Sequence, residues 1–99
     1  MTENSNDRVA ACPEEMAHVD RLMSGLFGGL VKVHLTGGGN LVGLVSILDR
    51  ATVESGVRAT VTLTTIEHES VILDLLDIES AESAFVEYRS AFAAAGFSI

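Results

Sequence analysis

The sequence predicts a mainly β fold: a small bent-strand barrel of four or five antiparallel strands, with an N-terminal helix before the strands and a C-terminal helix after them. Residues 31–36 and 57–64 alternate apolar with polar side chains, which is the period of a strand with one buried face. Glycines 37–39 follow the first of these segments and supply the backbone freedom of a tight hairpin. Apolar residues at helical spacing in residues 13–27 and 80–95 predict the two helices.

Length and composition indicate one domain and exclude several classes of protein. The chain has 99 residues, of which 47% are hydrophobic, enough for one modest core and for apolar surface left over for a partner. Its 14 acidic and 6 basic residues give a net charge of -8, which argues against a broad phosphate-binding surface. The single cysteine, Cys12, excludes an internal disulfide and favours a cytoplasmic location. No apolar run approaches the roughly 18 residues of a membrane span, and the polar first residues do not resemble a signal peptide.

The N-terminal part divides into a tail and a helix. Residues 1–11 are expected to be a disordered tail, and residues 12–99 a single barrel domain with its C-terminal helix. Pro13 suits the first position of a helix, and the two glutamates after it suit the first turn, where the helix dipole favours negative charge. The apolar stripe of this helix consists of Met16, Val19, Met23, Leu26 and Phe27.

The second strand of the hairpin carries a glycine, Gly43, where a packed side chain is expected. A glycine inside a strand marks a bulge or a sharp bend, and a strongly bent strand lets a very small sheet curl into a barrel. Asp49 is predicted to end this strand, and the turn-forming residues from 49 to 56 predict a loop.

Residues 71–78 are apolar on both faces apart from Asp74 and Asp77, so one face is predicted to fill the barrel and the other to meet a helix or another subunit. The two aspartates either face solvent and prevent edge aggregation, or line a pore in a ring of copies. Ser80 is predicted to cap the second helix, with Glu82 in its first turn. The candidate oligomer interface consists of Val71, Leu73, Leu75 and Ile78.

The hairpin resembles the first sequence motif of the Sm-like family, which includes the Sm, archaeal Sm-like and Hfq proteins. That motif has alternating apolar residues, a turn glycine, a second glycine five positions on, and an aspartate six positions after that. Gly38, Gly43 and Asp49 match these three positions, and the predicted helix over residues 13–27 stands where the family has its helix. The resemblance covers residues 13–80 and implies an Sm-like, also called SH3-like, barrel that assembles with copies of itself into a ring.

The residues that make the RNA pocket of this family are replaced in this chain. Val53 stands where an asparagine is usual, and Asp74 and Leu75 stand where the second motif has an arginine and a glycine. The resemblance implies RNA as a partner, whereas these replacements and the acidity argue against it. Lys32 and Arg58 are the weak candidates for RNA contact.

Two functions from different classes follow. The first is a non-enzymatic Sm-like module that forms a homo-oligomeric ring, with RNA association left open. The second is an acidic protein-binding inhibitor or immunity-type factor, whose carboxylates occupy a basic site on a partner protein. Carboxylates gathered on one face would favour the second function, whereas an even spread would favour the first. The histidines and Cys12 lack metal-ligand spacing and no nucleophile motif occurs, so no enzyme activity, cofactor or metal is predicted.

Overall fold

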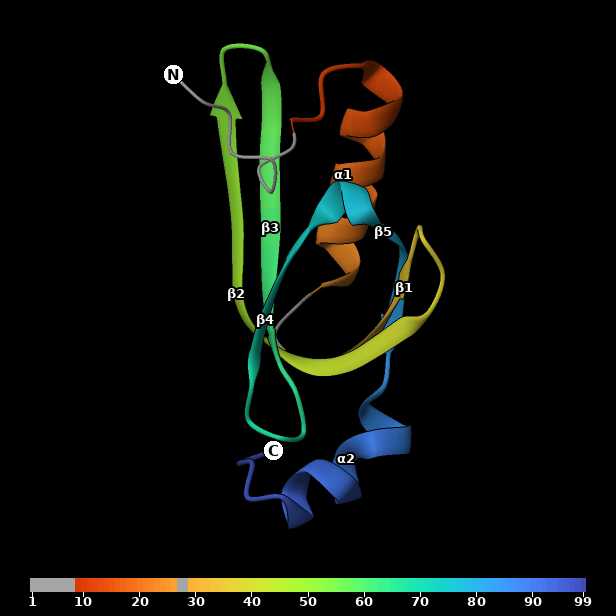
Figure 1. The fold of residues 1–99 in the computed structure, drawn as a ribbon, viewed down its shortest axis with the longest axis vertical. Coiled ribbons are helices and arrows are strands. Elements are labelled where there is room, and N and C mark those ends of the chain that lie inside the picture. The colour runs from red at the N-terminus through yellow and green to blue at the C-terminus, as the bar shows by residue number, and fades with distance from the viewer. Residues whose placement is uncertain (1–8, 27–28) are drawn as a thin grey trace.

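One antiparallel sheet of five strands organises the fold (Figure 1). The computed structural model describes residues 9–26 and 29–99. The strands lie in the order β4–β3–β2–β1–β5, so β4 and β5 are the two edges of an open sheet. The strands are β1 (Leu30–Leu35), β2 (Asn40–Val53), β3 (Gly56–Thr64), β4 (Ser70–Asp74) and β5 (Ile78–Ser83). The helices are α1 (Pro13–Gly25), the short 3-10 helix η1 (Leu75–Asp77) and α2 (Phe85–Ala94).

The predicted set of antiparallel strands with a helix at each end is confirmed, but the strands do not close into a barrel. No ladder joins β4 to β5 within the described ranges. At the end of β4 the carboxylate of Asp74 accepts a hydrogen bond from the backbone N–H of Leu76 at 2.9 Å and caps η1. The chain therefore leaves the extended conformation between β4 and β5, and each of these strands keeps one open edge.

Helix α1 follows its prediction closely. Pro13 is its first residue, and both acidic residues of the first turn are the predicted glutamates. The helix ends at Gly25, so the prediction that it includes Leu26 is wrong, and the predicted last residue, Phe27, lies outside the described residues. Val19 and Leu22 are buried, so the apolar stripe packs onto the rest of the fold.

The β1–β2 hairpin has the predicted glycine turn, in which Gly38 and Gly39 adopt positive φ angles of 99° and 86°. The loop predicted over residues 49–56 is wrong, because β2 continues to Val53 and β3 begins at Gly56. Pairing along the whole of this ribbon satisfies backbone N–H and C=O groups that a loop would leave to water.

Strand β2 is strongly curved and runs beside β1 and then beside β3 (Figure 1), and Gly43 is its buried glycine, paired with Val31 of β1. A Cβ atom built on Gly43 would lie 2.9 Å from the Cβ of Leu63 and 3.1 Å from the carbonyl oxygen of Thr64. The pairing register of β2 with β3 also shifts between Val45 and Ile47, which is a β-bulge. The close approach and the bulge together produce the bend expected at this glycine.

The segment after β3 differs most from the prediction. The strand predicted over residues 71–78 is divided, because β4 ends at Asp74 and η1 follows it. The helix predicted from Ser80 is wrong in its first part, since residues 78–83 form β5 and pair with β1. Without β5, strand β1 would leave one side of its backbone unpaired, so sheet pairing outweighs the local capping signal. The second helix begins at Phe85.

Apolar side chains are buried on both faces of the sheet. The inner face, where α1 packs, holds the main core, in which Val33, Val61 and Leu63 have no exposed surface. The outer face holds a smaller core under α2, formed by the buried residues Leu30, Ala84 and Phe92. Around these three pack Val42, Leu44, Ile66, Tyr88, Phe97 and Ile99.

The tail predicted over residues 1–11 is wrong at Ala10, which is fully buried. The N–H of Ala10 donates to the carbonyl oxygen of Val57 at 2.7 Å, and the N–H of Val57 donates back to Ala10 at 3.0 Å. This bridge lies beside the part of β3 that β4 does not reach. Residues 1–8 lie outside the described residues.

Candidate functional site

The two edge strands are the part of the fold on which the predicted self-assembly depends. On β4, Ile72 exposes 71% of its surface. On β5, four of the six residues are exposed. A strand edge presents a row of N–H and C=O groups that pairs readily with another chain unless something covers it.

The four predicted interface residues fall into two groups. Leu75 and Ile78 have no exposed surface and belong to the main core, so their prediction as interface residues is wrong. Val71 and Leu73 lie on β4 and are partly buried, and Leu73 packs against the main core. The exposed apolar residue of this strand is Ile72, which was not among the predicted interface residues.

Ile72 belongs to a row of side chains across three strands. Ile47 on β2 pairs with Thr62 on β3, and Thr62 pairs with Ile72 on β4. Directly paired residues of antiparallel strands place their side chains on the same face. The neighbours of Thr62, Val61 and Leu63, point inward, so this row lies on the outer face. We call Ile47, Thr62 and Ile72 the outer row.

The three residues on which the resemblance to the Sm-like family rests are spread along the hairpin and the ribbon. Gly38 lies in the turn, Gly43 pairs with Val31 at the bend, and Asp49 lies further along β2 opposite Thr60. Asp49 is exposed, whereas Asp74 keeps only 5% of its surface exposed. The prediction that Asp74 faces solvent is therefore wrong, because its carboxylate caps η1.

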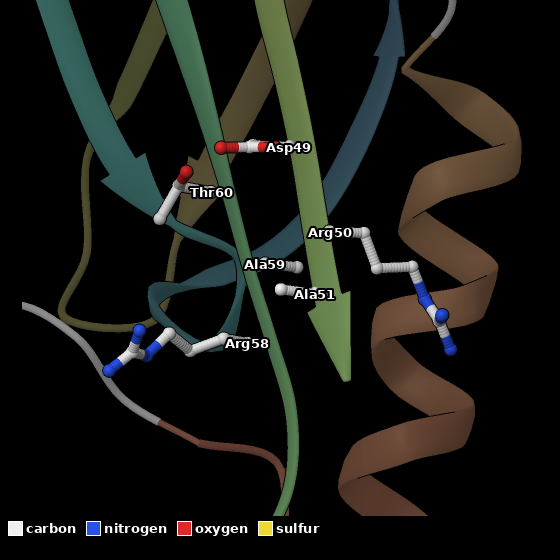
Figure 2. A pocket seen from close by; sticks show the side chains of 6 residues that line it. All are labelled: Asp49, Arg50, Ala51, Arg58, Ala59 and Thr60. Atoms are coloured by element: carbon white, nitrogen blue, oxygen red, sulfur yellow. The ribbon is translucent and has the colours of Figure 1, made fainter. Parts of the chain in front are cut away.

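A cavity of about 170 Å³ lies along the β2–β3 ribbon, lined by Asp49, Arg50, Ala51, Arg58, Ala59 and Thr60 (Figure 2). Arg50 points toward α1, where its Nη2 lies 3.3 Å from Oδ1 of Asp20, whereas Arg58 points to the other side of the ribbon. The Nε atom of Arg58 is buried and has no hydrogen-bond partner among residues 9–26 and 29–99. Because the two guanidinium groups point apart, they do not form one anion site.

The two candidate RNA contacts do not converge either. Lys32 lies on β1 opposite Glu82 of β5, whereas Arg58 lies on β3, and β2 runs between their strands. His34, two residues from Lys32, is 3.1 Å from the same Glu82 carboxylate. Phosphate binding needs several cations along one path, and this pair does not supply it.

The acidic side chains are distributed over the molecule. In the part of the chain that the structure describes, the exposed carboxylates belong to Glu14 and Asp20 on α1, Asp49 on β2, Glu54 in the β2–β3 turn, Glu67 and Glu69 in the β3–β4 turn, Glu79 and Glu82 on β5, and Glu87 on α2. In the described part of the chain no three His, Cys, Asp or Glu side chains come close enough together to hold a metal ion. None of the described helices has the length and apolar character needed to cross a membrane.

The three histidines bind backbone or carboxylate oxygens rather than one another. His18 contacts the carbonyl oxygen of Ile78 at 2.6 Å and ties α1 to the start of β5. His68 has a positive φ angle of 67°, contacts the carbonyl oxygen of Ala95 at 2.7 Å and stacks on Phe97 with ring centroids 4.3 Å apart. These contacts fasten elements together.

Comparison of the chain with models of known protein families, with curated proteins and with solved structures finds no match.

Proposed function

We propose that this chain is a non-enzymatic, Sm-like assembly module that joins copies of itself edge to edge into a closed homo-oligomeric ring. The observation that carries the proposal is the pair of open edges, β4 and β5, at opposite ends of one sheet. An interface between two different surfaces of the same chain repeats from copy to copy and closes into a ring when the rotation fits. Pairing β4 of one copy with β5 of the next uses both edges and leaves none exposed.

Three further features support assembly. The helix before the strands and the sharply bent β2 agree with what the resemblance to the Sm-like family implies. Ile72 gives the β4 edge an apolar side chain that gains from burial. The exposed carboxylates of the described residues are divided among both helices, two strands and two turns. That spread favours the module over the alternative of an acidic inhibitor that fills a basic site on a partner.

The experiment is light scattering coupled to size-exclusion chromatography, applied to three proteins. We expect the wild type to have several times the 10.5 kDa mass of one chain. Ile72→Lys places a charge on the β4 edge and is expected to lower the mass to that of one chain, with the far-ultraviolet circular dichroism spectrum of the folded protein unchanged. Ala17→Lys is the matched control, since it adds the same charge at an exposed position on α1. A wild-type mass equal to one chain at micromolar concentration would refute the proposal.

A further inference from the structure

Four large apolar side chains are exposed in the described part of the chain, and they form two pairs. Ile47 and Ile72 are 59% and 71% exposed and are the ends of the outer row. Phe85 and Val86 are 44% and 96% exposed and are consecutive residues in the first turn of α2. Each pair alone offers little apolar surface, but packing one pair against the other would bury both.

The first turn of α2 carries a cation beside its apolar pair. Arg89 lies one turn after Phe85, and its guanidinium carbon is 5.7 Å from the centre of the Phe85 ring. Val86 is three residues before Arg89 and so lies on the same side of the helix. Glu87 lies on the opposite side from Phe85 and Arg89, because two residues correspond to about 200° of helical rotation. This exposed side of α2 is therefore apolar and positively charged.

The outer row has the complementary charge next to it. The β3–β4 turn, which leads directly into Ser70 and Ile72, carries the exposed carboxylates Glu67 and Glu69. Arg89 is the one cation of α2, within the described residues. An apolar pair with a cation thus matches an apolar row with two carboxylates.

The positions of the two surfaces identify a second copy as the occupant. The outer row reaches the sheet edge at β4, and α2 begins two residues after the other edge strand, β5, on the same outer face (Figure 1). We infer that the first turn of α2 in one copy docks, through Phe85, Val86 and Arg89, onto the outer row of the next copy. The inference rests on the edge-to-edge assembly proposed above, because pairing β5 of one copy with β4 of the next brings α2 beside that row.

Cysteine cross-linking in the assembled protein tests the contact. All variants carry Cys12→Ser, which removes the one native thiol. Val86→Cys is co-expressed with Ile72→Cys, and separately with Ile47→Cys, the two chains bearing tags of different mass. A disulfide forms only when the Cα atoms approach within about 7 Å. Because the two variants mix at random in a ring, we expect up to about half of the chains to migrate as a mixed dimer on a non-reducing gel in at least one pairing.

The controls separate this contact from other arrangements. Val86→Cys with Ala17→Cys, an exposed position on α1, is expected to give no mixed dimer. Assembly of the wild type without either mixed dimer overturns the α2 docking and leaves the edge pairing standing. A dimer between two Val86→Cys chains also overturns it, because it indicates a symmetric contact of α2 with α2. A wild-type mass of one chain overturns both the docking and the assembly.

Discussion

At Gly43 the backbone of β2 passes so close to β3 that a side chain has no room. The atoms nearest to a Cβ on Gly43 would be the Cβ of Leu63 and the backbone oxygen of Thr64, and neither is the far end of a flexible side chain. Relief therefore requires the two strands to move apart. The missing side chain at Gly43 therefore allows the close approach of β2 to β3, two residues before the bulge that begins at Val45.

We expect Gly43→Val to destabilise the fold by about 1–3 kcal/mol, as overpacking of a closely packed site does. The measurement is the free energy of unfolding in urea. Gly37→Val is the control, since it adds the same side chain in the exposed turn where no atom lies within 4 Å. Equal free energies of unfolding for both variants would show that β2 does not need its close approach to β3.

Glycines and prolines were the residues that sequence alone could place, because their backbone requirements are local. Pro13 begins a helix and Gly38 takes the turn conformation for reasons that need no tertiary contact. Ile72 could not be identified in this way. It stands between two other apolar residues, Val71 and Leu73, so a two-residue period cannot show which face is exposed. Only the pairing with Thr62 decides it.

Among the elements, prediction failed where sheet pairing competes with local signals. The stretch around Ser80 has a helix cap and an acidic first turn, yet it forms β5 because β1 needs a partner. The run over residues 71–78 has the composition of one strand, yet Asp74 interrupts it by capping η1. Local preferences amount to about 1 kcal/mol or less per residue, so long-range pairing outweighs them. The edges of the sheet, and with them the candidate site, follow from this pairing.

Leu75 is the buried residue of η1, and its substitution tests whether it belongs to the core rather than to an interface. Leu75 has no exposed surface, so Leu75→Ala is expected to cost about 2–5 kcal/mol of stability through lost contacts and a residual cavity. Leu73→Ala is the matched comparison, because the same atoms are removed from a partly buried position on β4 and the loss should be smaller. Urea unfolding of both variants provides the measurement. If Leu75→Ala lowers the free energy of unfolding no more than Leu73→Ala does, Leu75 is not a core residue and the correction of the interface is wrong.

For the whole molecule, charge determines which partners are accessible. The net charge of -8 repels phosphate, and Lys32 and Arg58 lie on strands that are not neighbours. We expect weak or no binding of generic uridine-rich RNA, with any residual affinity falling steeply as salt rises. Fluorescence anisotropy of a labelled uridine oligomer at about 50 and 200 mM salt measures this. Submicromolar affinity at the higher salt would contradict the expectation.

The two cores on opposite faces share one sheet but differ greatly in size. Among the described residues, the main core contains twelve buried apolar residues, whereas the outer core contains three. Parts of a protein with few buried contacts open more often than the whole molecule unfolds. We therefore expect helix α2 to be the first cooperative unit to exchange its backbone amides in native-state hydrogen exchange, before the ladders of β1, β2 and β3. In that open state we expect Leu30, Val42 and Leu44 to lose their cover and to lie exposed on a sheet that is still paired.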